Sequence, residues 1–291
     1  MSLQSLLEAG KFVVTAEVGP LKGTDTTEIV EVAELLRGRV DAANVTDQQS
    51  SVMRMGSLAV CHLLKESGLE PILQMTCRDR NRLALQSDLL SAYALGIENV
   101  LALTGDLPSL GDHPQAKPVF DLDSVQLLWV IKRLNEGYDM VDNELKGKPN
   151  FFPGAVVNPG MGSEAAFELQ LIKMEKKIAT GARFFQTQAV YEPGAFAKFM
   201  KRVKGFGIPI LVGIIPLKSA GMARYMNKNV AGVFVPEELI NKMAEAEDKA
   251  ATGIEIAANL IKELRDICQG VHIMAIGWEK IVPGVLDVAG L

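Results

Sequence analysis

The stretch Asn99-Val-Leu-Ala-Leu-Thr-Gly-Asp-Leu-Pro108 contains an apolar run that ends at a Gly-Asp turn. Its apolar residues occupy consecutive positions without alternation, which is typical of a strand buried on both faces of a parallel sheet. Gly105 lets the chain turn, and Asp106 stands at the carboxyl end of the strand. Ligands of α/β folds bind at this end. Asp106 is therefore a candidate site residue, with a turn residue as the alternative, because aspartate is common in turns.

Runs of this kind alternate with helical segments along the chain. We expect strands over residues 12–18, 41–46, 71–77, 99–104, 152–157, 184–189, 209–216 and 271–276. Helices are predicted over 26–37, 51–67, 81–95, 124–135, 164–180 and 193–203, with two or three more between 220 and 268 and a closing helix over 278–288. Eight strands that alternate with helices indicate a parallel sheet, and eight is the number at which it closes into a barrel. The prediction is an α/β fold, a (β/α)8 TIM barrel with extra helices before the eighth strand, as a single domain over residues 1–291.

Composition narrows the class of protein. The 291 residues have a formal net charge of −5 and no dense basic tract, which argues against a nucleic-acid surface. No apolar run reaches the ~20 residues of a membrane span, and no signal peptide is visible. The three cysteines lie far apart in no zinc spacing, so we expect buried, reduced thiols and no metal site. The absence of GxGxxG and GxxxxGK[ST] argues against a dinucleotide fingerprint and a P-loop. We expect a soluble cytoplasmic enzyme or binding protein.

Polar residues end the other predicted strands as well. Glu17 lies in an otherwise apolar strand, so it is a candidate general acid, with a buried salt bridge to a lysine as the alternative. Gln186 and Gln188 are two residues apart and are expected to face the same way, with satisfied core amides as the alternative. Further polar residues at predicted strand ends are Asn44, Thr46, Asp47, Gln74, Thr76, Thr104, Asn158, Lys218 and Lys280. Closure of the barrel would gather these side chains at one end.

In their order along the chain, these strand ends resemble those of the methylenetetrahydrofolate reductase family of flavin-dependent (β/α)8 barrels. The resemblance covers residues 12–280. The motifs that carry it are Thr15-Ala-Glu-Val-Gly-Pro20, Asn44-Val-Thr46, Met75-Thr-Cys77, Leu101-Ala-Leu-Thr-Gly-Asp-Leu-Pro108, and Lys176-Lys-Ile-Ala-Thr-Gly-Ala182 followed by Thr187-Gln188. Each motif is weak alone, and their placement at successive strand ends makes the combination specific.

The resemblance implies an oxidoreductase of one-carbon metabolism and methionine biosynthesis that reduces 5,10-methylenetetrahydrofolate to 5-methyltetrahydrofolate. It implies a bound flavin, FAD with FMN as the alternative, as the source of the hydride. Glu17 falls at the position of the general acid that opens the five-membered ring of the folate, and Asp106 at that of an aspartate beside flavin and pterin. Gln188 matches a pterin contact, and Lys280 lies near the folate-tail position. Flavin contacts are implied for Thr46, Gln74, Leu103, Thr104, Gly105, Asp106, Val157, Asn158 and Lys177.

Several positions depart from the family pattern. Gln74, Thr104 and Val156 or Val157 stand where the family often has His, Arg and Tyr around the flavin. Ser219-Ala220 stands where NADH-using members carry an aromatic residue, and Trp278 replaces an arginine near the folate tail. The electron donor therefore stays open between NADH, NADPH, ferredoxin and an electron-delivering partner subunit.

Alternative functions and partners follow from the same residues. A pterin-binding barrel lyase or transferase without flavin is one alternative, and a non-catalytic barrel subunit of a larger complex is another. Glu17, Asp106 and Gln188 argue against the latter, because a scaffold has no need of all three. We expect a tetrahydrofolate substrate and an oligomer. The basic stretch over residues 198–204 is favoured as the solvated face of a helix over a surface for a partner.

Overall fold

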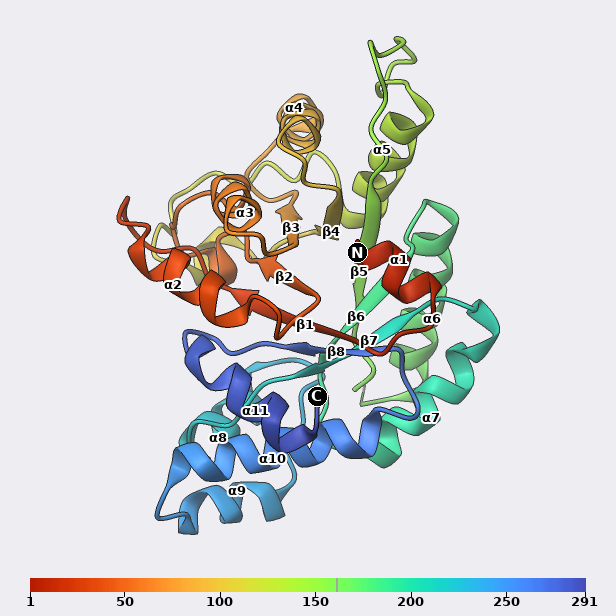
Figure 1. The fold of residues 1–291 in the computed structure, drawn as a ribbon. Helices are drawn as coiled ribbons and strands as arrows, with labels where there is room; N and C mark the ends of the chain where they lie inside the picture. The colour runs from red at the N-terminus through yellow and green to blue at the C-terminus, as the bar shows by residue number, and fades with distance from the viewer. Residues whose placement is uncertain (161) are drawn as a thin grey trace. The chain divides into compact units, whose positions relative to one another are not determined.

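The computed structural model of the protein describes residues 1–160 and 162–291. Eight strands follow one another in a closed barrel, and the neighbouring strands pair in parallel (Figure 1). They are β1 (Val13–Val18), β2 (Ala42–Val45), β3 (Pro71–Thr76), β4 (Asn99–Leu103), β5 (Phe152–Val157), β6 (Phe184–Ala189), β7 (Ile210–Ile214) and β8 (Gly270–Ile273). The predicted (β/α)8 barrel is confirmed, and every predicted strand lies where the sequence indicated it.

The helices also follow the predicted order. They are α1 (Leu3–Glu8), α2 (Thr27–Leu36), α3 (Ser57–Glu66), α4 (Arg82–Ala94), α5 (Ser124–Glu136), α6 (Glu164–Ala179), α7 (Pro193–Val203), α8 (Ala220–Asn229), α9 (Glu237–Glu245), α10 (Lys249–Leu264) and α11 (Val282–Ala289). Three helices, α8 to α10, lie between β7 and β8 where the regular alternation has one, so the predicted extra helices before the eighth strand are confirmed. Short 3-10 turns are η1 (Gln49–Ser51), η2 (Pro108–Leu110), η3 (Lys204–Phe206) and η4 (Glu279–Ile281). Among the described residues, no helix is long and apolar enough to cross a membrane.

Two features of the helices differ from the prediction. The helix predicted over residues 51–67 begins only at Ser57, because η1 precedes it with left-handed backbone at Gln48, Ser50 and Ser51. Such φ values cannot continue into an α-helix, so the chain needs several further residues before the helix begins. The sequence prediction also missed α1, which precedes the first strand and buries Leu3, Leu6 and Leu7.

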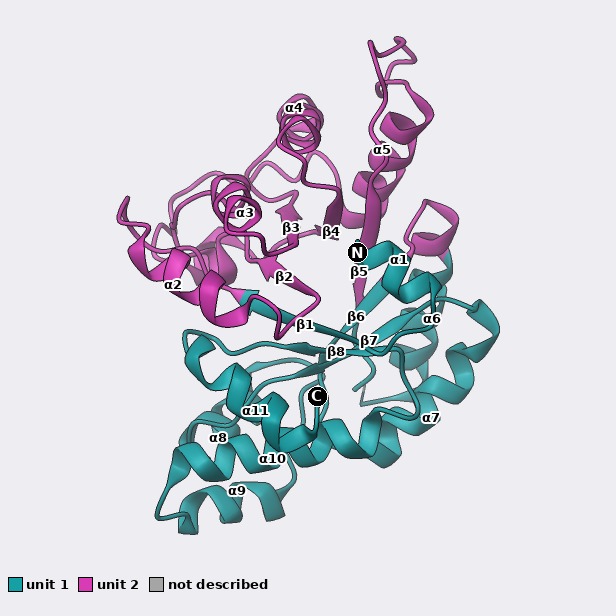
Figure 2. Ribbon diagram, in the orientation of Figure 1, with its two compact units in different colours: residues 1–17, 157–175, 185–291 teal, residues 18–156, 176–184 magenta. Residues whose placement is uncertain are grey.

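The chain divides into two compact units (Figure 2). Unit 1 comprises residues 1–17, 157–175 and 185–291, and unit 2 comprises residues 18–156 and 176–184. Unit 1 thus contains β7, β8 and helices α7 to α11, whereas unit 2 contains β2 to β4 and helices α2 to α5. The prediction of a single domain over residues 1–291 stays a prediction.

Strand β4, which contains the apolar run from Asn99 to Leu103, lies in the core of unit 2. In β4, Val100, Leu101 and Ala102 are buried, as expected for a strand covered on both faces. It pairs with β3 in a parallel register that sets Ile72 opposite Asn99, and all of β3 is buried. Helix α5 begins with a capping box in which Asp123 and Gln126 satisfy each other's backbone N–H groups. Local sequence signals and burial therefore agree in this unit.

Helix α7 shows how unit 1 divides its apolar and charged side chains. Phe196, Phe199 and Val203 are buried, and burying a phenylalanine contributes about 1.5–3 kcal/mol. Lys198, Lys201 and the neighbouring Arg202 are exposed, and Arg202 pairs with Glu164 and Glu168 of α6. The basic stretch is thus on the exposed face of an amphipathic helix, and its interpretation as a solvated surface rather than a surface for a partner stays a prediction.

The three cysteines are free and buried, as predicted. Burial raises the pKa of the Cys77 thiol to about 12 and that of Cys268 to about 11. Because the thiolate is the reactive form, both are unreactive core side chains at neutral pH.

Candidate functional site

The end of β4 presents a carboxylate that forms no hydrogen bond or ion pair within the described part of the chain. Gly105 has φ +93°, and a Cβ at this position would lie 3.0 Å from Cβ of Arg78 and 3.1 Å from Cβ of Thr76. Only glycine therefore fits this turn. Asp106 follows it and is exposed, and its carboxylate has no hydrogen bond or ion pair to any described residue. Its carboxylate is therefore available to a ligand, and the choice between a ligand contact and a turn residue stays open.

Two residues that sequence reasoning missed hold this turn in place. The Ser51 hydroxyl lies 3.1 Å from both the Asp106 and the Leu107 carbonyl oxygen and donates to them. Arg78 Nη1 in turn donates to Ser51 Oγ over 3.1 Å, and Nη2 reaches the carbonyl oxygen of Gln48. The Arg78 side chain is only 2% exposed. The sequence shows only an arginine directly after a predicted strand, and its burial and its bonds to this turn appear only in the structure.

The end of β2 offers an unused hydroxyl in unit 2. Thr46 is buried, and its Oγ1 has no hydrogen-bond partner among the described residues. A buried polar atom of this kind is costly unless a ligand or water satisfies it. Its position is therefore one that a hydrogen-bonding ligand would complete.

The neighbouring Asp47 is, by contrast, fully paired. Its carboxylate accepts hydrogen bonds from Thr76 N and Oγ1, both over 2.9 Å, and from Arg80 Nη1 over 2.7 Å. Arg80 also pairs with Asp88 over 2.8 Å. Burial lowers the pKa of Arg80, but the hydrogen bonds and charges of Asp47 and Asp88 outweigh burial and raise it above its ordinary value. This cluster fixes the end of β2 against the end of β3.

Lys177 and Gln74, two further predicted flavin contacts, also lie in unit 2. Lys177 is buried on α6, and its Nζ donates to the Val156 carbonyl oxygen over 2.8 Å. The positive charge of this ammonium group suits an anionic ligand. Gln74 is buried within β3, and its backbone oxygen accepts a hydrogen bond from Ser57. Two more predicted flavin contacts lie at the end of β4: Leu103 is half-buried and Thr104 is exposed.

The end of β5 and the loop after it belong to unit 1. Val157 is buried, and Asn158 uses both ends of its carboxamide internally. Asn158 Nδ2 donates to the Ala231 carbonyl oxygen over 2.9 Å, and Oδ1 accepts from Gly160 N over 3.1 Å. Asn158 therefore ties two loops together, and its predicted flavin contact stays a prediction.

Glu17 is buried in unit 1 beside a histidine that the sequence analysis had not singled out. Thr15 of β1 stands opposite His272 of β8 in the parallel register. Glu17 Oε1 lies 3.6 Å from His272 Nε2, and His272 Nδ1 lies 3.0 Å from Thr15 Oγ1. Gln186 Nε2 donates to the same hydroxyl over 3.3 Å. The structure thus places a histidine beside Glu17, and this histidine is charged only when its ring is protonated.

Gln188 is half-buried, and its Oε1 accepts from Ala189 N over 3.0 Å. The pairing of β6 with β7 has an irregular register between Gln186 and Ala189. The expectation that the two glutamines face the same way rested on regular alternation, which this irregularity interrupts. Gln186 donates a hydrogen bond to the buried Thr15 hydroxyl, whereas Gln188 lies at the end of β6, next to a pocket.

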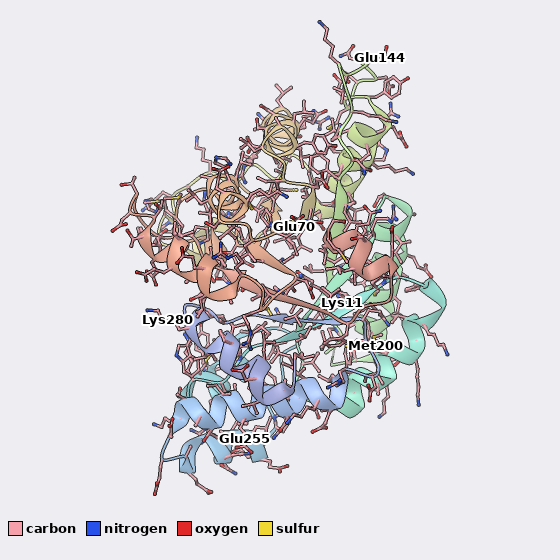
Figure 3. The ribbon with its side chains drawn as sticks, in the orientation of Figure 1. Lys11, Glu70, Glu144, Met200, Glu255 and Lys280 are labelled. Carbon is pink, nitrogen blue, oxygen red and sulfur yellow. The ribbon has the colours of Figure 1, made fainter. Side chains whose placement is uncertain are left out.

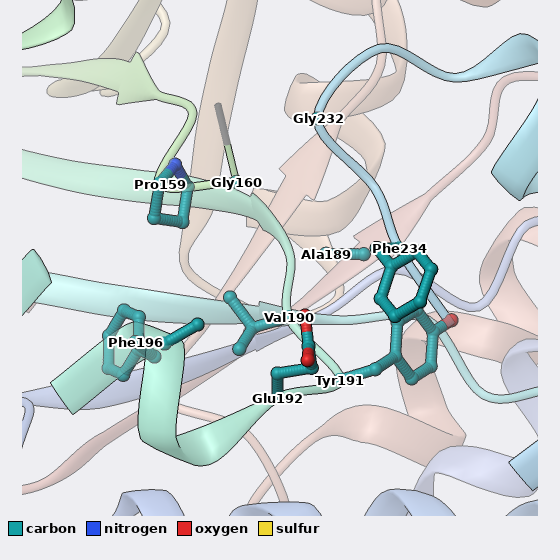
Figure 4. Close-up of a pocket in the computed structure, with 10 residues that line it drawn as sticks. Pro159, Gly160, Ala189, Val190, Tyr191, Glu192, Phe196, Gly232 and Phe234 are labelled. Carbon is teal, nitrogen blue, oxygen red and sulfur yellow. The ribbon is translucent and has the colours of Figure 1, made fainter. Parts of the chain in front are cut away.

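That pocket lies entirely in unit 1 (Figure 4). Its lining is largely apolar and aromatic, with one carboxylate, and consists of Pro159, Gly160, Ala189, Val190, Tyr191, Glu192, Ala195, Phe196, Gly232 and Phe234. Tyr191 is fixed by its hydroxyl, which donates to the Ile215 carbonyl oxygen over 2.7 Å. The sequence analysis gave no indication of this pocket, because residues distant in the chain form it.

The turn after β8 contains Trp278 and Lys280, and Lys218, which follows β7, contacts this turn. Lys218 Nζ donates to the Ile276 carbonyl oxygen over 2.6 Å and lies 5.9 Å from the centre of the Trp278 ring. Lys280, labelled in Figure 3, lies in η4 and is exposed. These are two positive charges of unit 1 that a carboxylate-bearing ligand can use.

A family model of methylenetetrahydrofolate reductase matches residues 2–290 of the chain. The chain belongs to the methylenetetrahydrofolate reductase family. The resemblance inferred from the strand-end motifs is therefore confirmed. The predicted site residues divide between the units, with Glu17, Val157, Asn158, Gln188 and Lys280 in unit 1 and the others in unit 2. That they act on common ligands stays a prediction.

Relatives and solved structures agree with this membership. The chain is 28% identical to methylenetetrahydrofolate reductase 2 of Schizosaccharomyces pombe, over 75% of this chain and 35% of that protein. It is 24% identical to 5,10-methylenetetrahydrofolate reductase of Pectobacterium carotovorum, over 90% and 84%. The chain thus spans about a third of the length of the yeast relative. A Clostridium thermocellum protein that binds two copies of 5-methyl-5,6,7,8-tetrahydrofolic acid shares the fold, with a TM-score of 0.65, 18% identity, and coverage of 98% and 96%.

Proposed function

We propose that this protein reduces 5,10-methylenetetrahydrofolate to 5-methyltetrahydrofolate, with a hydride from a reduced flavin. The observation that carries the proposal is the family match over residues 2–290, together with a buried carboxyl at Glu17, where the family motif has its general acid. Binding of a methyltetrahydrofolate by a protein of the same fold supports the substrate class. The alternatives of a flavin-free pterin lyase or transferase and of a non-catalytic subunit are outcomes of the experiments below.

The residues predicted to contact a flavin suit such a ligand. Thr46 has a buried hydroxyl without a partner among the described residues, and Lys177 has a buried ammonium group, whose positive charge suits a phosphate. A side chain at Gly105 would meet Arg78 and Thr76, so the glycine is what allows the tight turn that places Asp106 at this strand end. Asp106 adds a carboxylate with no internal partner. We propose FAD as the flavin, with Lys177 placed to neutralise phosphate charge.

The chain's own residues supply proton transfer and orientation. When bound, the reduced flavin supplies the hydride. Glu17 donates a proton to a nitrogen of the five-membered ring, the C–N bond breaks with its electron pair passing to that nitrogen, and an electrophilic iminium is left. Gln188 and Asp106 bind and orient the pterin by hydrogen bonds. Lys280 attracts the carboxylates of the folate tail. The apolar pocket beside Gln188 offers cover for an aromatic part of the substrate.

The first test is the absorbance spectrum of the purified protein. We expect a yellow protein with one non-covalent flavin per chain, and mass spectrometry of the released cofactor distinguishes FAD from FMN. Thr46→Val, which keeps the shape of the side chain and removes the unpartnered hydroxyl, is expected to lower flavin occupancy. A colourless protein that takes up no flavin on reconstitution would overturn the proposal and favour the flavin-free alternative.

The same preparation identifies the electron donor, which we propose to be NAD(P)H or a partner subunit. At the position where NADH-using members carry an aromatic residue, Ser219 is the N-cap of α8 and accepts from Met222 N over 3.1 Å. Anaerobic mixing with NADH, NADPH and a low-potential donor, followed by flavin bleaching, shows which of them reduces the protein.

Asp106→Asn is expected to raise the reduction potential of the flavin and to weaken folate binding. A negative charge near the ring opposes the addition of electrons, and its removal takes this opposition away. A hydrogen bond to a charged group contributes roughly 1.5–3 kcal/mol, so the Kd for folate should rise about 10- to 150-fold. Dye-coupled potential measurement and folate titration check both effects, with Asp266→Asn, an exposed aspartate before β8, as the matched control. An unchanged potential would return Asp106 to the role of a turn residue.

A further inference from the structure

A buried chain of polar side chains connects β6, β1 and β8 within unit 1. Gln186, Thr15, His272 and Glu17 are each less than 9% exposed. Thr15 Oγ1 is the central atom, with three neighbours: the Val271 carbonyl oxygen at 3.3 Å, Gln186 Nε2 at 3.3 Å and His272 Nδ1 at 3.0 Å. Polar groups buried together in this way are stable only when their donors and acceptors match.

Counting donors and acceptors assigns the proton on the imidazole. A threonine hydroxyl donates one hydrogen bond and accepts two. The Val271 carbonyl oxygen can only accept, so the hydroxyl donates there; the Gln186 amide N–H₂ can only donate, so the hydroxyl accepts from it. The remaining lone pair accepts from His272, which requires a hydrogen on Nδ1. All three contacts are satisfied in this arrangement alone, and Nε2 is then the nitrogen that faces Glu17.

We propose that His272 is a positioning residue that shares a proton with Glu17. With Nδ1–H committed to Thr15, a single proton belongs to either Glu17 Oε1 or His272 Nε2, which lie 3.6 Å apart. This separation is longer than a hydrogen bond, but such contacts are often long in ligand-free structures and shorten when substrate binds. The inference rests on the proposed folate reduction, for which Glu17 supplies the proton.

In this arrangement one proton is consumed in each turnover and is replaced from water. In the substrate complex the shared proton lies on Glu17, and it passes to the ring nitrogen as the C–N bond breaks. The Glu17 carboxylate then faces an unprotonated Nε2, and the pair takes up one proton from water before the next turnover. His272 thus fixes the carboxyl of Glu17 in one orientation and holds its proton while the acid is not engaged.

Nitrogen-15 NMR of the flavin-loaded protein tests the assignment without measuring activity. The chain has three histidines, so His272→Asn identifies the signals of His272. We expect Nδ1 to show the shift of a protonated nitrogen, and Glu17→Gln to move the Nε2 signal while leaving Nδ1 in place. An unprotonated Nδ1 in the wild-type protein would overturn the proposal. An Nε2 chemical shift that is the same in the wild-type protein and in Glu17→Gln would also overturn it.

Kinetics provide the second readout. His272→Asn retains a donor toward Thr15 and removes the partner of Glu17. It is expected to slow the folate half-reaction about 10- to 100-fold, the range for a catalytic group misplaced by about 1 Å, with flavin reduction by the donor and substrate KM unchanged. His272→Gln, whose amide reaches the Nε2 position, should recover part of the rate. His62→Asn on α3 is the matched control. A wild-type rate in His272→Asn would refute the role of His272, whereas an inactive wild-type protein would refute the proposed function instead.

Discussion

Glu17→Gln is expected to lower the rate of methylenetetrahydrofolate reduction by about 10²–10⁴-fold, the usual contribution of a general acid. The glutamine keeps the size and hydrogen-bonding shape of the buried side chain but carries no acidic proton. Reduction of the bound flavin by its donor needs no proton from Glu17, so that half-reaction should continue at a near wild-type rate. Anaerobic stopped-flow spectroscopy measures the two half-reactions separately, by flavin bleaching with donor and recovery of colour with folate.

Glu31→Gln, the same substitution at an exposed position on α2, is the control for this experiment. It should leave both half-reactions unchanged. Equal slowing of both half-reactions by Glu17→Gln would indicate a general disturbance of the site rather than the loss of an acid. A near wild-type folate rate would show that another group protonates the substrate.

The barrel could be predicted because nearly all residues of its strands are buried. A strand covered on both faces, such as β4, is recognised as an apolar run, and eight largely buried strands in alternation with helices leave few architectures. The start of α3 could not be predicted in the same way. The polar run over residues 48–51 is compatible with a helix by composition, and only the three-dimensional structure shows its left-handed backbone. Local preference is a weak guide wherever tertiary contacts set the dihedral angles.

Some residues of the candidate site could likewise be predicted from the sequence, and others could not. Glu17 and Asp106 could be proposed from the sequence because each interrupts or ends an apolar strand. His272 and Thr15 could not, because their contact with Glu17 comes from the pairing of β1 with β8, whose sequences lie more than two hundred residues apart. The same holds for Arg78 and Ser51, which hold the turn at Asp106 by bonds across loops. Sequence patterns identify residues at strand ends, whereas the partners that orient them appear only when the register is known.

Asp47→Ala is expected to lower the free energy of unfolding by about 3–5 kcal/mol, the cost of removing one partner of a buried ion pair. The Asp47 side chain is 0% exposed and Arg80 is 18% exposed, so little solvent is available to replace the lost bonds. The substitution leaves the Arg80 guanidinium with Asp88 alone, and it leaves Thr76 N and Oγ1 without their acceptor. Urea denaturation followed by circular dichroism measures the change.

Two companion variants separate charge from hydrogen bonding at this cluster. Asp47→Asn still offers an oxygen to Thr76 but no charge to Arg80, so it should fall between the wild-type protein and Asp47→Ala. Asp121→Ala removes a carboxylate that pairs with Arg82 over 2.8 Å at the surface, and there we expect a much smaller change because water replaces the partner. Thr46, with its unpartnered hydroxyl, directly precedes Asp47. Asp47→Ala should therefore also reduce flavin occupancy, and full occupancy in this variant would show that the cluster stabilises the fold without shaping the flavin site.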